Sequence, residues 1–263
     1  IFYEQRSNLS FHEVKTLKYA RITLIQHGIE SLSDGILNLM KKGVNVTQNL
    51  SLLRFARWFD ISINWNLLVA IPNDKISFYK ELLDLLPKIP HLHPPSGIAP
   101  IVIHRFSPYY NLPDKFMIKN IRPKKFYKQI FPKHTDFDKV AYQLTGDFRT
   151  DYYDCKEGKD ISKKLYKIIN HWRKLWQSTK DPLPHLLLTK INNSTFLLSD
   201  SRENAKKINY KLLSRKQAKD ILTTTENTSL SRQRLDWALE KNYMHSLDKK
   251  FVSLVVAPYD LFC

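Results

Sequence analysis

Cysteine is scarce in this chain, and so are long apolar runs and acidic residues; each shortage excludes a class of protein. The 263 residues include two cysteines, Cys155 and Cys263, which excludes a disulfide framework and a cysteine-rich zinc site. No run of about eighteen apolar residues occurs, so no segment is predicted to span a membrane. The first residues have neither a basic start nor an apolar core. We therefore expect no signal peptide and a cytoplasmic protein.

Acidic residues are outnumbered by basic ones, 25 against 42, which gives a formal net charge of +17. An excess of this size predicts attraction to polyanions, to acidic peptides or to an acidic partner protein. The lysines are scattered along predicted helices, and the chain has no RNA-binding or zinc-finger signature. We therefore favour a basic solvated surface and expect no nucleic acid partner. A basic nucleic-acid-binding module is the last-ranked alternative.

Strand-like and helix-like stretches alternate in the first half of the chain. The β-rich runs cover residues 2–5, 21–26, 61–69 and 100–105. Helical patterns cover residues 34–42, 48–59 and 75–86. This alternation predicts a parallel sheet of four consecutive βα units, too few to close a barrel. Asn64 and Asn66 are two residues apart in one predicted strand, so we expect them to share a face.

The second half has a different pattern. Nine prolines lie between positions 87 and 132, which predicts an irregular connector over 107–135. Helices are predicted at 135–144 and 161–178, and the apolar stripe of the second is best explained as core. The pair Asn192-Asn193 joins two β-rich runs, 185–191 and 194–199, as a hairpin. The remaining predicted elements are a strand at 208–213, helices at 215–222 and 231–241, and a strand at 251–256.

Five stretches, in order, resemble one family. They are YEQRSNL (3–9), IQHGIESLSDGILNLMKKGV (25–44), WNLLVAIPND (65–74), LPKIPHLHPPSGIAPIVIHRFSPYY (86–110) and RPKKFYKQIFP (122–132). The chain resembles the C-terminal part of a radical S-adenosylmethionine (SAM) enzyme. The closest family is the RiPP (ribosomal peptide) maturation radical SAM proteins, which include cobalamin-dependent peptide C-methyltransferases. The resemblance is strongest over residues 1–133.

The resemblance, taken with the patterns above, implies an α/β architecture in three parts. Residues 1–133 would form a partial parallel (βα) barrel that lacks its first strands. Residues 134–182 would be a helical connector. Residues 183–263 would form a winged-helix-like α+β module.

The resemblance also implies site residues. It places eight around SAM: Glu4, Gln26, Gly28, Glu30, Ser31, Asn66, Pro72 and Asp74. It places six on the side of the peptide substrate: His91, Pro94, Pro95, Arg105, Ser107 and Tyr109. The family's Gly-x-Pro-Gly-Glu turn reads Ala70-Ile71-Pro72-Asn73-Asp74 here. Two positions at which glycine gives backbone room or a positive φ therefore carry side chains.

The family's chemistry also needs a [4Fe–4S] cluster held by three cysteine thiolates, conventionally in a Cys-x3-Cys-x2-Cys motif. This chain has no such motif. We therefore expect it to be the C-terminal portion of an enzyme that modifies a precursor peptide, inactive alone. It would be a decayed remnant, which we favour, a cut fragment, or one part of a split enzyme whose N-terminal half carries the cluster. Cluster and cobalamin are expected in full-length relatives but are not ligated by this chain. Catalytic residues are not identified.

The histidines and the C-terminal strand edge raise two further hypotheses. His91, His93 and His104 have no spaced cysteine or carboxylate to complete a site, so no metal is predicted. The alternative function is a non-catalytic protein that binds the leader of a precursor peptide. An extended leader would add as a strand along the edge near 208–213, beside the helix at 231–241.

Overall fold

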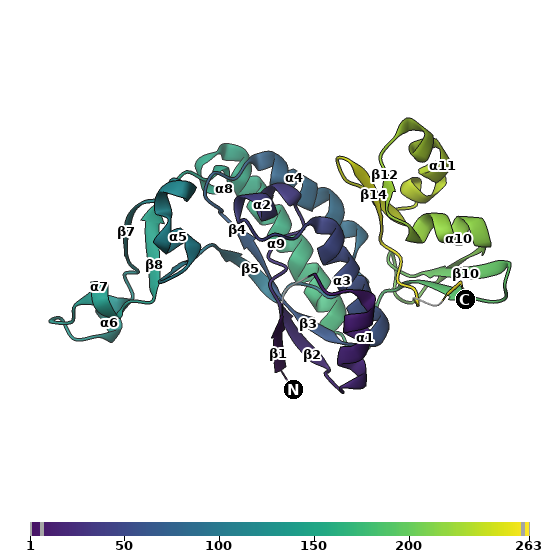
Figure 1. The fold of residues 1–263 in the computed structure, drawn as a ribbon, viewed down its shortest axis with the longest axis horizontal. Coiled ribbons are helices and arrows are strands. Elements are labelled where there is room, and N and C mark those ends of the chain that lie inside the picture. Colours follow the sequence, from purple (N-terminus) through teal and green to yellow (C-terminus); the bar gives the residue numbers. More distant parts are fainter. Residues whose placement is uncertain (1, 6–7, 259–260, 263) are drawn as a thin grey trace.

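The structure is a computed structural model that describes residues 2–5 (backbone only), 8–258 and 261–262. It is a mixed α/β fold in three regions (Figure 1). A layer of parallel strands and helices lies in the middle, an antiparallel arm projects from one end, and a C-terminal module lies at the other. Within the described residues, no helix is both long and apolar enough to cross a membrane.

The middle region is built from parallel strands in the order of the chain. One sheet has the order β1-β2-β3 and a second pairs β4 with β5. The strands are β1 (Phe2–Gln5), β2 (Leu24–His27), β3 (Ser62–Asn64), β4 (Asn66–Val69) and β5 (Gly97–Pro100). The helices of this region are α1 (Phe11–Tyr19), α2 (Asp34–Leu39), α3 (Val46–Phe59), α4 (Ile76–Leu85), the short 3₁₀ turn η1 (Leu86–Lys88) and α9 (Lys156–Gln177). The predicted parallel strands are confirmed, whereas the barrel stays a prediction.

The run 61–69 is predicted as one strand, but it forms two strands in different sheets. The break falls at Trp65, which is 2% exposed and donates its indole N–H to the carbonyl of His93 at 3.1 Å. Burial still alternates through the break, because Ile63, Trp65 and Leu67 are buried. Asn64 and Asn66 therefore lie together on the opposite, exposed face, as the two-residue spacing predicts.

The predicted strand at 100–105 is wrong in its bounds. β5 ends at Pro100, and β6 (Ile103–His104) pairs instead with β8 in an antiparallel sheet of order β6-β8-β7. This sheet and its short helices form the arm. Its other elements are α5 (Pro108–Asn111), the 3₁₀ turn η2 (Pro113–Phe116), β7 (Lys119–Pro123), α6 (Tyr127–Ile130), α7 (Phe137–Val140) and β8 (Gln143–Asp147).

The predicted helix at 135–144 is also wrong. Only α7 is helical there, because the hydroxyl of Tyr127 accepts hydrogen bonds from the backbone N–H groups of Tyr142 and Gln143, both at 3.0 Å. These bonds take backbone donors that a continuing helix would have used. The chain then pairs with β6 and β7 as strand β8.

The long helix α9 confirms the prediction at 161–178 and begins earlier, at Lys156. Its apolar stripe packs on the middle region. Trp172 and Trp176 donate their indole N–H groups to the carbonyls of Leu92 and Pro90, both at 2.9 Å. The helix therefore fixes the loop that carries His91 and His93. A short helix, α8 (Asp151–Asp154), precedes it.

The C-terminal module has two antiparallel sheets and two helices. Its first sheet has the order β11-β10-β9, and the hairpin at Asn192 is confirmed. The side chain of Asn192 accepts the backbone N–H of Thr195 at 2.8 Å, which closes the turn. The elements are β9 (Leu186–Lys190), β10 (Thr195–Asp200), β11 (Asn209–Ser214), α10 (Arg215–Leu222), β12 (Thr225–Glu226), α11 (Ser229–Glu240), β13 (Met244–Ser246) and β14 (Lys250–Ser253). The winged-helix comparison stays a prediction.

Candidate functional site

The open face of the parallel sheet carries a row of polar residues. Glu4, Gln26 and Asn64 are register partners on β1, β2 and β3. Gln26 and Asn64 are exposed, and for Glu4 the backbone position alone is described. Ser96 donates its hydroxyl to the amide oxygen of Asn64, which fixes that side chain. Amides in such a row offer both donors and acceptors to a polar ligand lying on the sheet.

Asn66 extends this row onto the second sheet, where its partner is Gly97. A Cβ on Gly97 would lie 4.0 Å from the amide oxygen of Asn66. The glycine therefore leaves open space beside that oxygen. Asn66 and Gln26 are both exposed on the open face, so the structure leaves two of the predicted SAM-side residues accessible.

The turn after β2 is held from inside by Asn49 of α3. This fully buried side chain donates to the carbonyls of Ile29 and Ser31, at 3.0 and 2.9 Å. Ser31 is itself 0% exposed, and its hydroxyl accepts the backbone N–H of Ser33 at 3.2 Å. Ser31 therefore shapes the turn from within the core.

Glu30 lies in the same turn with a left-handed backbone, φ 57°. Its carboxylate lies 2.8 Å from the ammonium of Lys42, and its backbone carbonyl accepts the N–H of Leu68 at 2.8 Å. A Cβ on Gly28 would lie 3.3 Å from this carboxylate and 3.4 Å from the Lys42 nitrogen. Gly28 thus allows the ion pair to sit close against the backbone of the turn.

The turn after β4 has the backbone that its resemblance to a glycine-containing turn implies. Ala70 and Asn73 have φ of 55° and 62°. Pro72 and Asp74 are buried. Glycine adopts the left-handed conformation without strain. At Ala70 and Asn73, which have side chains, the surrounding structure holds the backbone in this conformation.

Asp74 holds this turn to two other segments. Its carboxylate accepts the backbone N–H of Ile71 at 3.0 Å, the hydroxyl of Thr150 at 2.8 Å and the phenol of Tyr79. The N–H of Tyr152 reaches its second oxygen at 3.4 Å. Burial and the neighbouring Asp74 carboxylate raise the pKa of Tyr79, so the phenol keeps its proton and donates. The oxygens of Asp74 are therefore used within the chain.

The predicted peptide-side residues fall into two groups at opposite ends of β5. His91, Pro94 and Pro95 precede the strand, and Arg105, Ser107 and Tyr109 follow it. His91 is 0% exposed and donates from Nε2 to the carbonyl of Leu254 at 2.8 Å. Burial, and then the charge of Arg202, hold the pKa of His91 well below its usual range. The structure does not bring the two groups into one pocket.

In the second group, Arg105 forms its hydrogen bonds within the arm. Its guanidinium donates to the carbonyls of Ala141 and Asp138 and to the phenol of Tyr110. Ser107 caps α5 by accepting the backbone N–H of Tyr110. These two residues therefore build the arm locally.

Tyr109 is the member of that group which comes near the turn after β2. Its hydroxyl is buried without a hydrogen-bond partner, and burial together with the charge of Glu30 raises its pKa to about 12. Nearby, Asn73 donates its amide to the carbonyl of Phe116 at 3.2 Å. The 3₁₀ turn η2 therefore contacts the turn after β4.

A cavity of about 480 Å³ lies beside this turn. Its walls come from the ends of β4 and β5, from β8 and from α8, and include Ala70, Pro100, Thr145 and Tyr153. Carboxyl ends of parallel strands are the usual position of ligand sites in α/β proteins. The sequence patterns did not predict this cavity, because they predicted no strand at 143–147, where β8 forms one wall.

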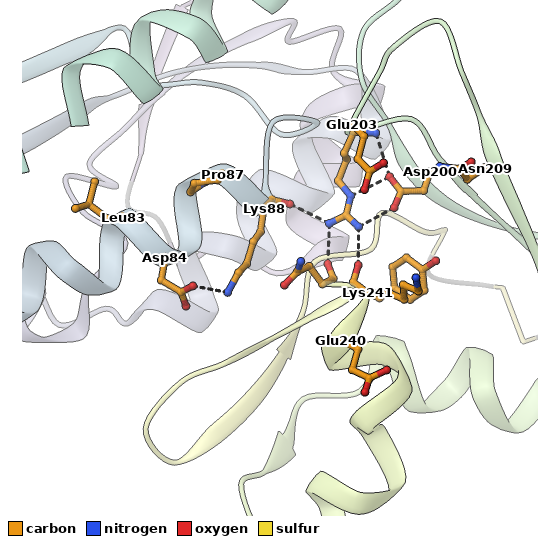
Figure 2. A pocket seen from close by; sticks show the side chains of 12 residues that line it. Leu83, Asp84, Pro87, Lys88, Asp200, Glu203, Asn209, Glu240 and Lys241 are labelled. Atoms are coloured by element: carbon orange, nitrogen blue, oxygen red, sulfur yellow. Dashed lines mark hydrogen bonds and ion pairs between the residues drawn. The ribbon is translucent and has the colours of Figure 1, made fainter. Parts of the chain in front are cut away.

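A larger crevice of about 760 Å³ separates the end of α4 and η1 from the C-terminal module (Figure 2). Charged side chains line it, and Asp84 is paired with Lys88 at 2.8 Å. Asn209, the first residue of β11, also lines the crevice. The crevice therefore opens at the start of the edge strand of the module.

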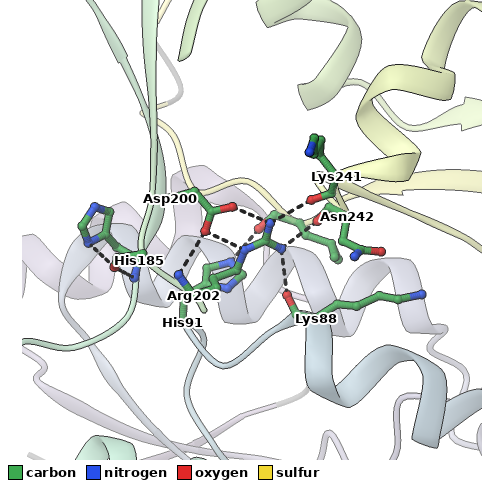
Figure 3. A network of polar contacts seen from close by, with 9 residues as sticks. Lys88, His91, His185, Asp200, Arg202, Lys241 and Asn242 are labelled. Carbon is green, nitrogen blue, oxygen red and sulfur yellow. Dashed lines mark hydrogen bonds and ion pairs between the residues drawn. The ribbon is translucent and has the colours of Figure 1, made fainter. Parts of the chain in front are cut away.

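Arg202 crosses the floor of this crevice (Figure 3). Its guanidinium is bidentate to Asp200, at 2.9 and 2.7 Å. The remaining N–H groups donate to the carbonyls of Lys88, Lys241 and Asn242, at 3.0, 3.1 and 2.7 Å. All five donors are thus used, and one side chain joins η1 of the middle region to β10 and to the end of α11 in the module. Sequence reasoning missed Arg202, because all its partners except Asp200 lie 39 to 114 residues away.

β11 is an edge strand with exposed apolar side chains. Tyr210 and Leu212 are each 63% exposed. In the described part of the chain, no backbone hydrogen bond reaches the outer edge of β11. Lys211 lies over the ring of Trp237 in α11, 4.5 Å from its centroid, so strand and helix sit side by side. An unpaired edge next to a helix can accept an extended peptide as a further strand.

The donors of this chain do not fit an iron–sulfur cluster. Cys155 is the free cysteine among the described residues, and Cys263 lies outside them. Within the described ranges, no three His, Cys, Asp or Glu side chains gather as metal ligands do. A [4Fe–4S] cluster takes three or four thiolates, and the described residues do not supply them.

No protein-family model matches the chain, and no curated protein matches it. Among solved structures, it is similar to the archaeal Elp3 of Methanocaldococcus infernus with N-terminal residues 1–46 deleted. The TM-score is 0.40 and the identity 14%, over 96% of this chain and 78% of that chain. This weak structural neighbour has a radical SAM-type fold.

Proposed function

We propose that the protein is the C-terminal part of a cytoplasmic radical SAM enzyme that modifies a ribosomally made precursor peptide. C-methylation is the reaction in the cobalamin-dependent members of the family that the sequence resembles. The observation that carries the proposal is the polar row on the open face of consecutive parallel strands, formed by Gln26 and Asn64 with Glu4 in register. The positive φ of Ala70 and Asn73, at two positions where the family has glycine, supports it.

Gln26, Asn64 and Asn66 are the side chains that would hold SAM. All three are exposed on the open face, and their amides suit the ribose hydroxyls and the amino-acid end of the cofactor. Ser31 and Asp74 would act by shaping the two turns, since both are buried and bonded within the chain. When bound, SAM would supply a 5′-deoxyadenosyl radical, and the electron for its cleavage would have to come from a cluster outside this chain. The cluster, and any cobalamin, would belong to an N-terminal half.

Binding of SAM to the chain tests this proposal. We expect equilibrium dialysis with labelled SAM to show saturable binding that Gln26→Ala and Asn64→Ala each weaken about tenfold, the effect of losing one hydrogen bond to a polar ligand. Gln177→Ala is the control, because this exposed amide ends α9 away from the open face. Absence of binding at millimolar SAM, or equal weakening by all three variants, would reject the SAM site.

A second candidate function, capture of the precursor's leader peptide, is favoured by one observation, the open edge of β11. An extended leader would pair with the backbone of β11 and cover Tyr210 and Leu212, while α11 flanks it. The basic surface would attract an acidic leader. This function needs neither SAM nor the missing cluster, so it stands even where the first proposal fails.

Fluorescence anisotropy tests peptide capture. The probe is a labelled synthetic acidic peptide, chosen because the basic surface predicts an acidic leader, and it is titrated with the full chain. We expect Tyr210→Ala and Leu212→Ala to weaken binding about tenfold or more, since each removes apolar area that the peptide covers. Tyr166→Ala is a matched control, because Tyr166 on α9 is also 63% exposed. Binding that is lost equally in Tyr166→Ala, or no saturable binding, would count against the edge as the site.

A further inference from the structure

The two faces of the sheet β11-β10-β9 are covered to different extents. The inner face packs on α10. Its side chains are buried, namely Leu186, Leu188, Phe196, Leu198 and Leu213. The alternate side chains point to the outer face. There Leu187 and Leu197 are half-buried, while Tyr210 and Leu212 at the edge are each 63% exposed. The outer face is therefore an apolar surface that the chain covers only in part.

The strand register places the exposed side chains of β11 at the open ends of rows that cross the sheet. Leu212 is paired with Leu197 of β10, and Tyr210 is paired with Ser199. Side chains directly opposite each other on neighbouring strands share a face of the sheet. A further strand added along the free edge of β11 would therefore place one side chain beside Tyr210 and one beside Leu212. Both would lie on the apolar outer face.

Lys211 lies between these two residues in the sequence and on the other face of the sheet. Its register partner, Leu198, is 1% exposed, so this row runs from the core to an exposed lysine at the edge. The ammonium of Lys211 lies over the ring of Trp237 and forms no ion pair within the described ranges. A side chain added opposite Lys211 would therefore meet an exposed cation. A carboxylate suits this position, because opposite charges on facing strands stabilise a sheet.

We propose that the edge of β11 selects an extended peptide in which apolar and acidic residues alternate, with the acidic side chain opposite Lys211 and apolar side chains opposite Tyr210 and Leu212. This inference rests on the second candidate function, peptide capture, and adds the pattern that the edge recognises. The order apolar–acidic–apolar is the same in both directions, so it fits a parallel or an antiparallel peptide strand. A shift of one residue would turn the carboxylate onto the apolar face, so the alternation also fixes the register.

Fluorescence anisotropy with three labelled synthetic peptides, each titrated with the full chain, tests the pattern. The first peptide carries Val-Glu-Val between flanking serines, the second carries Val-Lys-Val in the same place, and the third carries Ser-Glu-Ser. We expect the first to bind saturably and about tenfold or more tightly than the third, which lacks the apolar side chains. It should also bind about fivefold or more tightly than the second, whose lysine would face Lys211.

Charge reversal at Lys211 separates local pairing from attraction by the whole basic surface. Lys211→Glu should prefer the second peptide to the first, and Lys211→Gln should bind the two about equally. Lys167→Glu is the matched control, because the exposed Lys167 lies on α9 and its replacement changes the net charge by the same amount. This control should keep the preference for the first peptide.

The outcomes distinguish the pattern from peptide capture itself. Equal binding of the first peptide and either of the others by the wild type would overturn the alternating pattern and leave peptide capture in place. So would a reversed preference in Lys167→Glu, because net charge would then explain the selection. No saturable binding of any of the three peptides would overturn peptide capture and this inference with it.

Discussion

Replacement of Asp74 tests whether this carboxylate is a structural group. Three donors converge on one oxygen: the N–H of Ile71, the hydroxyl of Thr150 and the phenol of Tyr79. Hydrogen bonds to a charged group are worth about 1.5–3 kcal/mol each, and a buried donor left unsatisfied costs about 1–3 kcal/mol. Because the two hydroxyls can turn toward other acceptors, we expect Asp74→Ala to lower the free energy of unfolding by about 3–5 kcal/mol.

Asp74→Asn separates charge from shape. Its amide oxygen can keep the three shorter bonds, and its NH₂ then faces the N–H of Tyr152, which approaches the second carboxylate oxygen at 3.4 Å. We expect a smaller loss, about 1–3 kcal/mol, from the missing charge and the opposed donors. Urea unfolding at equilibrium measures both variants, with the exposed Asp248→Asn as a control expected to stay within about 0.5 kcal/mol of wild type. A loss under about 1 kcal/mol for Asp74→Ala would refute the reasoning.

Three further predictions concern the backbone conformation of Ala70, the junction formed by Arg202, and the pH dependence of stability. Ala70→Val should lower the free energy of unfolding, measured in urea, by about 2 kcal/mol or more, because a β-branched residue is strained at φ 55°. Ala70→Gly should change the same free energy by less than about 1 kcal/mol. Equal losses in the two variants would contradict this prediction. Arg202→Lys should lose about 2–4 kcal/mol in the same assay, since three donors cannot replace five, and a change under about 1 kcal/mol would contradict the role of Arg202. Burial lowers the pKa of His245 to about 4 and that of His93 to about 3. The unfolded chain therefore binds more protons below about pH 6.5, and stability should be full above that pH and fall progressively toward pH 4, by at most about 1.4 kcal/mol per pH unit per histidine. His245→Gln should flatten this dependence in thermal unfolding, and an unchanged slope would contradict it.

Local sequence patterns were enough to predict the helices and strands that are formed by residues close together in the sequence. The stripe that includes Leu165, Ile169 and Trp172 predicts α9, and all three side chains are buried. Asn192-Asn193 predicts the hairpin, because the turn is closed by a side chain within three residues. The alternation of strands and helices predicts the parallel order of β1 to β3.

Contacts between distant segments could not be predicted in this way. The predicted strand at 61–69 divides at Trp65, whose carbonyl accepts the backbone N–H of Ser96 and whose indole donates to the carbonyl of His93. The helix expected at 135–144 fails because Tyr127 binds two backbone N–H groups there. At the candidate site, the resemblance predicts site residues on two turns, which stays a prediction, whereas the burial of Ser31 and Asp74 depends on the tertiary packing. No spacing in the sequence could indicate it.

The use of every Arg202 donor has a consequence for how a long substrate would be handled. One side chain bonded to Lys88 on one side and to Lys241 and Asn242 on the other leaves little freedom for a hinge between the parallel layer and the module. A peptide bound along β11 would then have to span a fixed distance to reach the polar row of the sheet. The number of residues between its bound segment and the residue to be modified would therefore determine which residue reaches the sheet.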